Sequence, residues 1–145
     1  YLRRQLQLSL QHAGQAQPLS LVAVDLDNFS ALNQRFGHAE GDAVLQAISQ
    51  QLLLNLRCQD LLCRLAGDRF VVLLPNTGET LARQLAGELQ QAVAHLAHKT
   101  RQHGERLHLS ATVAVVMAVD EDPQTLLQRL NLALARAKQP LALSA

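Results

Sequence analysis

The spacing of hydrophobic and polar positions changes several times along the chain, and each change predicts a new element. Leucines at mostly helical spacing predict a helix over residues 2–12, and a short valine-rich run predicts a buried strand over residues 19–27. Helical spacing returns over residues 29–36 and again from residue 43 to about residue 57. The first part of the chain is therefore expected to form a helix, a strand and two more helices.

The second part of the chain predicts a β-hairpin followed by a helix, a strand and a last helix. Two apolar runs, residues 61–66 and 69–75, flank a short polar break and predict the hairpin. Residues 79–98 show an amphipathic helical pattern, residues 107–119 alternate as a strand does, and residues 123–138 are helical again. This order of elements favours an α+β fold, with helices packed on a largely antiparallel sheet.

Length and composition narrow the class of protein. The 145 residues suit a single domain over residues 1–145. A formal net charge of +1, scattered Lys and Arg and an aromatic content of 3% argue against a nucleic-acid polymer as partner. No apolar run approaches the roughly 20 residues of a membrane span, and no signal peptide is evident. We expect a cytoplasmic domain, which includes the cytoplasmic part of a membrane-anchored protein. Because the chain begins at Tyr1 rather than Met, we expect a piece of a longer protein.

Two cysteines, Cys58 and Cys63, lie five residues apart. This spacing fits neither a zinc site nor the disulfide framework of a secreted protein. We therefore expect two reduced thiols in or near the core.

Two acidic residues stand out by their position. Asp25 interrupts the apolar strand of residues 19–27, and Asp68 lies at the tip of the hairpin. If these strands are neighbours in the sheet, the two carboxylates meet at one edge. Together with a backbone carbonyl, they suit Mg²⁺ that carries a nucleoside triphosphate. Taken alone, such residues more often have a solvated or turn-capping role.

The order of the motifs is more specific. The segment VDLDNFSALNQRFGHAEGDAVL, residues 24–45, is followed by RCQDLLCRLAGDRFVVLLP, residues 57–75. Together they closely resemble the GGDEF family of diguanylate cyclases, in which a D-x-D-x-F strand precedes an N-x-x-x-G-H-x-x-G-D segment and a G-G-D/E-E-F hairpin. The resemblance extends from about Leu2 to Lys138 and includes the segments LSATVAVV and ALARAK.

This resemblance implies a fold, an activity and a cofactor. The fold is palm-like, or ferredoxin-like, with a central, mostly antiparallel sheet of about five strands flanked by helices. Members of the family join two GTP molecules into cyclic di-GMP, and each GTP is held by one subunit of an antiparallel dimer. In this chain Asp25, the backbone carbonyl of Leu26 and Asp68 would hold Mg²⁺. Asp25 and Asp68 would be the catalytic residues if the domain is active. The implied partners are GTP, cyclic di-GMP, a second copy of the domain and the adjacent domains of a larger multidomain signalling protein.

The resemblance also implies the nucleotide contacts. Asn33 and Asp42 would hydrogen-bond the guanine edge, and Phe29 would lie in the wall of the pocket. Gly67 would lie at the nucleotide in the hairpin, and Lys138 near the phosphates. Buried polar partners of this kind select guanine over bases that leave them unpaired.

Arg57 and Asp60 form an R-x-x-D motif before the hairpin. At this position the resemblance implies the inhibitory site through which many family members bind cyclic di-GMP. Arg can pair bidentately with a phosphate, and Asp can accept from guanine N–H groups. A local pair between the two side chains, with Arg57 near a helix C-terminus, is the alternative.

The hairpin signature departs from the family pattern, because residues 66–70 read Ala-Gly-Asp-Arg-Phe. Arg69 replaces an acidic residue of the family. At about 6 Å from a divalent ion and an effective dielectric constant of about 20, this swing of two charge units costs on the order of 10 kcal/mol before screening. Thr112 and Ala135 depart from the pattern as well.

We therefore predict a degenerate GGDEF domain of bacterial cyclic di-GMP signalling. It would bind GTP or cyclic di-GMP in a regulatory role, with little or no cyclase activity. The alternative is an active diguanylate cyclase that tolerates Arg69 and converts two GTP into cyclic di-GMP with Mg²⁺.

Overall fold

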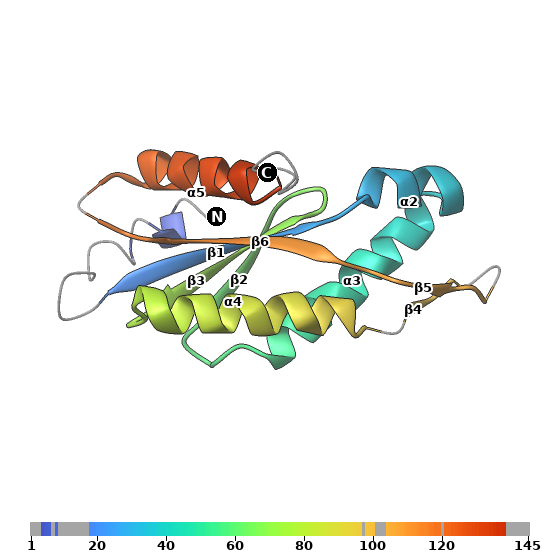
Figure 1. Ribbon diagram of the computed structural model, residues 1–145, viewed down its shortest axis with the longest axis horizontal. Helices are drawn as coiled ribbons and strands as arrows, with labels where there is room; N and C mark the ends of the chain where they lie inside the picture. Colours follow the sequence, from blue (N-terminus) through green and yellow to red (C-terminus); the bar gives the residue numbers. More distant parts are fainter. Residues whose placement is uncertain are drawn as a thin grey trace, which may run out of the picture.

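The computed structural model describes residues 4–6, 8, 18–96, 98–100, 104–119 and 121–138. Helices and strands follow one another in the order of an α+β fold (Figure 1). The elements are β1 (Leu19–Leu26), α2 (Phe29–Phe36), α3 (His38–Leu54), β2 (Leu61–Ala66), β3 (Arg69–Pro75), α4 (Glu79–Ala94), β4 (His98–Lys99), β5 (Arg106–Leu107), β6 (Ala111–Met117) and α5 (Pro123–Ala137).

The main sheet has the strand order β2-β3-β1-β6, and each neighbouring pair is antiparallel. All eight residues of β1 are buried, because this strand lies inside the sheet and both of its faces are covered. The register pairs Asp25 with Arg69 of β3 on one side and with Thr112 of β6 on the other. Directly opposite side chains lie on the same face of a sheet, so the register itself brings Arg69 next to Asp25.

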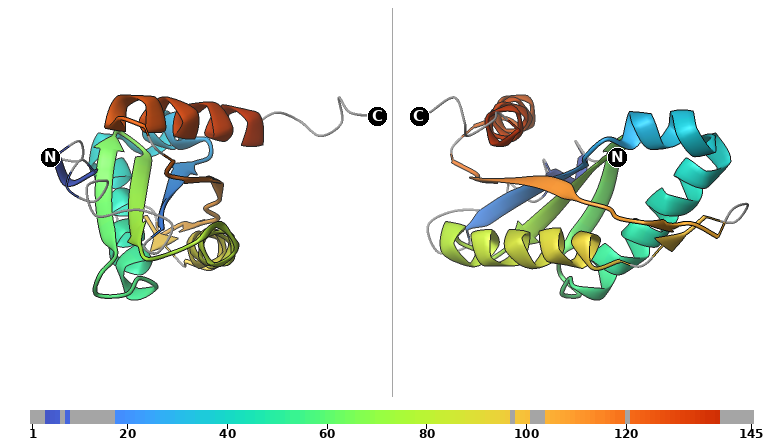
Figure 2. Two further views of the ribbon diagram at one scale, coloured as in Figure 1. Left: turned by 90° about the vertical axis from the view of Figure 1, so that its left-hand side faces the viewer. Right: turned by 45° about the vertical axis from the view of Figure 1, so that its right-hand side comes forward.

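Helices cover the two faces of the sheet, α5 on one side and α3 with α4 on the other (Figures 1 and 2). One core lies between the sheet and α3 and α4, and it includes Val22, Val24, Ile48 and Leu89. A second core lies under α5 and includes Leu21, Ala23, Val71, Leu126, Leu130 and Leu134. Because side chains of a strand alternate between faces, Asp25 shares the face of Leu21 and Ala23. The buried carboxylate therefore faces α5.

Several predicted boundaries are wrong, each for a local reason. Helix α3 begins at His38 and not at residue 43, because Gly37, with φ of 89°, turns the chain from α2 directly into α3. Helix α4 ends at Ala94, short of the predicted residue 98. Of the helix predicted over residues 2–12, residues 4–6 and 8 are helical, and the remainder lies outside the described residues.

The prediction of about five strands in the central sheet is also wrong. In the described part of the chain, the main sheet has four strands. The strand predicted over residues 107–119 is confined to Ala111–Met117, and Leu107 belongs instead to a small two-stranded sheet of β4 and β5. The predicted α+β class and the mostly antiparallel sheet flanked by helices are confirmed. Within the described ranges, no helix combines the length and apolar character that a membrane crossing requires.

Candidate functional site

The end of β1, the turn of the β2–β3 hairpin and helix α5 meet at one end of the sheet. Asp25 is 4% exposed near the end of β1. The next residue, Leu26, donates its backbone N–H to the carbonyl oxygen of Asp68 at 3.2 Å. This bond ties the hairpin tip to the end of β1. The structure thus brings Asp25, Leu26 and the backbone of Asp68 to the same end of the sheet. That Asp25, Leu26 and Asp68 hold a metal stays a prediction from the sequence.

Two cations lie on one oxygen of the Asp25 carboxylate. Lys138, the residue after α5, places Nζ 2.7 Å from Oδ2 of Asp25. Arg69 places Nη2 3.4 Å from the same oxygen, and it donates from Nη1 to Oδ1 of Asn131 on α5 at 2.9 Å. The other oxygen, Oδ1 of Asp25, is buried and has no hydrogen-bond partner among the described residues. Asn131 and Asp25 therefore hold the Arg69 guanidinium between α5 and the sheet.

These residues do not fit a divalent cation well. Asp25 and Asp68 contribute a formal charge of −2, and Arg69 and Lys138 contribute +2, so the four side chains sum to zero. Mg²⁺ is bound by oxygen ligands that carry uncompensated negative charge. Here one of the two carboxylates, Asp25, already pairs with two cations, and a metal ion would have to displace them. Among the described residues no three acidic, His or Cys side chains gather as a metal site.

Asp27, the second acid of the D-x-D motif, has a structural role. Its carboxylate accepts hydrogen bonds from Ser110 at 2.8 Å and from Thr112 at 2.7 Å. Its backbone N–H also donates to the carbonyl oxygen of Ser110. Asp27 therefore fastens the end of β1 to the start of β6. Thr112, which departs from the family pattern, supplies one of these bonds.

The junction of α2 and α3 positions two of the predicted nucleotide contacts. Asn28 has φ of 58°, a left-handed conformation that Asn tolerates better than most residues, and it turns β1 into α2. On α2, Phe29 and Asn33 pack against Gly41 of α3. A Cβ at Gly41 would lie 1.8 Å from Oδ1 of Asn33 and 3.2 Å from Cζ of Phe29. Only glycine permits this approach. The Asn33 oxygen is buried and lacks a hydrogen-bond partner among the described residues.

A pocket of about 520 Å³ opens beside Asp42, the residue after Gly41. This volume falls within the range of about 300–1,000 Å³ that small-molecule sites occupy. Phe29 and Asn33 do not line the pocket. Its lining residues come from α3, β2 and β3, and they are Asp42, Leu45, Gln46, Ser49, Leu53, Leu62, Arg64 and Phe70.

Arg64 is a cation of this region that the sequence reasoning missed. It donates from Nε to the carbonyl oxygen of Gly67 at 2.9 Å, so its guanidinium lies against the hairpin turn. Its side chain is exposed and lines the pocket. The available signal was its place on the strand that leads into the hairpin. Asn131 was missed as well, because the sequence gives no sign that α5 crosses over Arg69.

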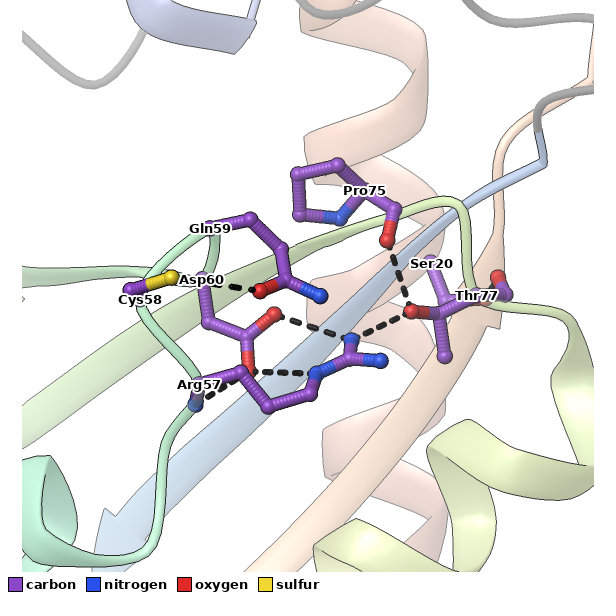
Figure 3. A network of polar contacts seen from close by, with 7 residues as sticks. All are labelled: Ser20, Arg57, Cys58, Gln59, Asp60, Pro75 and Thr77. Atoms are coloured by element: carbon purple, nitrogen blue, oxygen red, sulfur yellow. Dashed lines mark hydrogen bonds and ion pairs between the residues drawn. The ribbon is translucent and has the colours of Figure 1, made fainter.

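The R-x-x-D motif forms a closed local pair (Figure 3). Arg57 donates to Asp60 from Nε at 3.1 Å and from Nη2 at 2.9 Å, and its backbone N–H donates at 2.9 Å. Nη2 also donates to Oγ1 of Thr77 at 2.6 Å. The hydrogen bonds to Asp60 raise the pKa of Arg57 above its ordinary value, although burial opposes this shift. The local pair that the sequence left as an alternative is therefore formed.

Thr77 connects this pair to the sheet. Its hydroxyl donates to the carbonyl oxygen of Pro75 at 2.8 Å, and its own carbonyl oxygen accepts from the hydroxyl of Ser20 at 2.7 Å (Figure 3). The side chain of Asp60 is 0% exposed, whereas that of Arg57 is 38% exposed. The pair thus joins the turn after α3 to the end of β3 and the start of β1, and one edge of the guanidinium faces solvent.

The cysteines differ in their surroundings. Cys63 is buried in β2, and Cys58 is exposed in the turn that carries Arg57. Burial raises the pKa of the Cys63 thiol. The expectation of thiols in or near the core is confirmed for Cys63. Cys58 lies at the surface instead.

Comparison with known proteins gives a consistent result. A family model described as "Diguanylate cyclase, GGDEF domain" matches residues 1–141. The chain is 35% identical over 122 residues to diguanylate cyclase DgcP of Pseudomonas aeruginosa, covering 83% of this chain and 18% of the relative. It is 32% identical over 123 residues to the response regulator PleD of Caulobacter vibrioides, covering 83% of this chain and 27% of the relative. The chain therefore spans less than a third of the length of these two curated relatives.

Solved structures share the fold. The GGDEF domain of YfiN (TpbB) from Pseudomonas aeruginosa matches with a TM-score of 0.86 at 30% identity, covering 94% of this chain and 86% of that one. The active GGEEF domain of a diguanylate cyclase from Vibrio cholerae matches with a TM-score of 0.79 at 30% identity, covering 94% and 87%.

Proposed function

Because the chain belongs to the GGDEF domain family of diguanylate cyclases, we propose that it is a degenerate member that binds GTP in a regulatory role, with little or no cyclase activity. The observation that carries this proposal is the position of Arg69, whose guanidinium lies on the Asp25 carboxylate at 3.4 Å. A cation thus stands at the carboxylate that the family resemblance assigns to the metal.

The loss of catalysis follows from charge. Joining two nucleotides requires that negative charge developing at a phosphate be stabilised in the transition state. The family resemblance assigns that task to Mg²⁺, and the residues around Asp25 do not fit the ion. Asn131 holds Arg69 at the site, so the side chain does not simply point away into solvent. An active cyclase would require Arg69 and Lys138 to leave Asp25 together.

Retention of nucleotide binding is supported by two unpaired oxygens. Buried polar atoms normally have a hydrogen-bond partner, and each exception calls for an explanation. Among the buried side-chain nitrogen and oxygen atoms in the described part of the chain, the exceptions are Oδ1 of Asp25 and Oδ1 of Asn33, both of which belong to predicted site residues. A bound nucleotide that donates to Asn33 would remove one of them. The pocket beside Asp42, the other residue assigned to the guanine edge, has the volume that a base needs, although Asn33 does not line it.

Cyclic di-GMP at Arg57 and Asp60 is a second candidate. The Arg57 side chain is 38% exposed, and a phosphate could reach its open edge. Asp60 is fully buried and already accepts three hydrogen bonds from Arg57. Cyclic di-GMP would therefore have to bind through Arg57 alone or open the pair. For this reason we place GTP binding first.

We further propose that the bound state is passed to adjacent domains of the full-length protein or to a second copy of the domain. A cytoplasmic location remains a prediction from the family.

Calorimetric titration of the chain with GTP, with ATP and separately with cyclic di-GMP tests the proposal. We expect GTP to bind and ATP to bind at least about tenfold more weakly, because guanine-specific hydrogen bonds are lost. Asp42→Ala should weaken GTP binding, whereas Glu88→Ala, which removes an exposed acid of α4, should not. Equal binding of GTP and ATP, or an unaffected Asp42→Ala variant, would contradict the proposed site.

A further inference from the structure

We propose that Arg69 takes the place of the divalent cation, so that this domain binds the triphosphate of a guanine nucleotide without Mg²⁺. The inference rests on the proposed function and specifies how the same site recognises phosphate. It departs from the Mg²⁺ dependence that the family resemblance implies.

The Arg69 guanidinium has a fixed position. It is held from two sides, by Oδ1 of Asn131 at 2.9 Å and by Oδ2 of Asp25 at 3.4 Å. These contacts come from α5 and from β1, which are separate layers of the fold. A cation held in this way is positioned before the ligand arrives, as a bound metal ion would be.

The Arg69 guanidinium also has remaining capacity to donate. A guanidinium has five N–H donors, and its fork matches the geometry of phosphate oxygens. Nη1 and Nη2 of Arg69 each donate one hydrogen bond, and the side chain is 33% exposed. The guanidinium therefore keeps donors for a phosphate while it stays bonded to Asn131 and Asp25.

Two further cations lie near Arg69. Lys138 lies 2.7 Å from the same carboxylate oxygen and is 40% exposed, and Arg64 lies against the carbonyl oxygen of Gly67 in the hairpin. Three cations, Arg69, Lys138 and Arg64, therefore lie at this end of the sheet, and two of them contact Asp25. A nucleoside triphosphate finds three cations there without any metal, while Mg²⁺ would have to displace the two that lie on Asp25.

The test is GTP titration of the chain by calorimetry, once in EDTA and once in excess Mg²⁺. We expect the two dissociation constants to agree within about threefold. Arg69→Gln, which keeps an amide that can bond to Asn131 but removes the charge, should weaken binding in EDTA by about tenfold or more. Arg83→Gln is the matched control, because Arg83 pairs with Glu79 on the helix across the sheet, and it should bind like the wild type.

A second measurement, without nucleotide, tests the inference on the wild-type chain itself. Its result does not depend on whether a particular variant folds. Electron paramagnetic resonance of Mn²⁺, used as a probe for the Mg²⁺ site, should show no stoichiometric binding to the wild-type chain. Arg69→Glu, which restores an acidic residue, should gain it. Stoichiometric Mn²⁺ binding by the wild type, or GTP binding that appears only with Mg²⁺, overturns the inference. Either result leaves GTP binding by the domain intact, but removes the charge argument for its lost turnover. Absence of GTP binding in both buffers overturns the proposed function, and the inference with it.

Discussion

The guanidinium of Arg69 lies 3.4 Å from the carboxylate of Asp25, and the two residues are directly paired in the register of β3 and β1. Their proximity is thus a property of the sheet and not of a mobile surface side chain. Asn131 reinforces it from α5 at 2.9 Å. A change at one position of the hairpin has placed a fixed cation on a buried acid, and the expected consequence is binding without turnover.

Gly41 is predicted to be required for the shape of the nucleotide site. Gly41→Ala would place a Cβ 1.8 Å from Oδ1 of Asn33. Rotation of the Asn33 side chain relieves this clash, so we expect stability to fall by about 1 kcal/mol and GTP affinity to fall by about tenfold. Urea unfolding and calorimetric titration measure the two effects.

The matched control is Gly87→Ala on α4, where a Cβ would meet nothing within 4 Å. Because Ala is the better helix former, this variant should gain about 0.5–1 kcal/mol and bind GTP normally. Unchanged GTP affinity in Gly41→Ala would remove Asn33 from the site.

The Arg57–Asp60 pair is predicted to stabilise the fold. Arg57→Ala leaves the fully buried Asp60 carboxylate with only the backbone N–H of residue 57 as a donor at that position. We expect a loss of about 1–2 kcal/mol in the free energy of unfolding, reduced from the larger cost of a fully buried pair because Arg57 is partly exposed. Arg83→Ala, which breaks an exposed pair with Glu79, should cost less than about 0.5 kcal/mol. Equal losses in the two variants would contradict a stabilising role of the Arg57–Asp60 pair.

The stability of the fold is predicted to depend on pH through Glu121. This residue accepts hydrogen bonds from Arg129, and these bonds hold the pKa of Glu121 below its ordinary value of 4.5. Because the folded-state pKa lies below the unfolded-state one, the contribution is fully present above about pH 4.5 and is lost as the pH falls through the folded-state pKa. Glu121→Gln should therefore lower stability at pH 7 and should converge on the wild type at the acid end, as urea unfolding at several pH values would show. A difference that persists or grows below the folded-state pKa would contradict this assignment.

The two thiols are predicted to react at different rates. Cys58 is exposed, whereas Cys63 is buried in β2 and its pKa is raised by that burial. Since the thiolate is the reactive form, a thiol reagent should modify Cys58 rapidly and Cys63 only after unfolding. Cys58→Ser should abolish the rapid phase. Two rapid equivalents in the folded wild type would contradict the burial of Cys63.

Much of this architecture was predictable from the sequence, because hydrophobic periodicity reports burial directly. The strands of the hairpin and the helix over Phe29–Phe36 lie where the pattern placed them. The two-residue strands β4 and β5 are too short to produce a periodic signal, and the boundary of α3 depends on the backbone angle of Gly37.

The site was predictable in its residue types but not in its contacts. The order of the motifs identified Asp25, Asp68 and Arg69 as the positions to compare with the metal site of the family. The family pattern marked Arg69 as a departure. Whether Arg69 turns outward or toward Asp25 depends on strand register and on Asn131, which is 62 residues away in sequence. Contacts of this kind arise only once the sheet and α5 are packed together.

The central claim is binding without turnover, and its most direct test is product analysis of saturating GTP incubated with Mg²⁺ and the wild-type chain. Arg69→Glu is measured in parallel, and a catalytic rate should appear there if Arg69 is the main defect. For the wild type we predict bound GTP and no cyclic di-GMP beyond a trace relative to the protein. Cyclic di-GMP formed over many turnovers by the wild type would contradict the account, whether or not Arg69→Glu raises the rate.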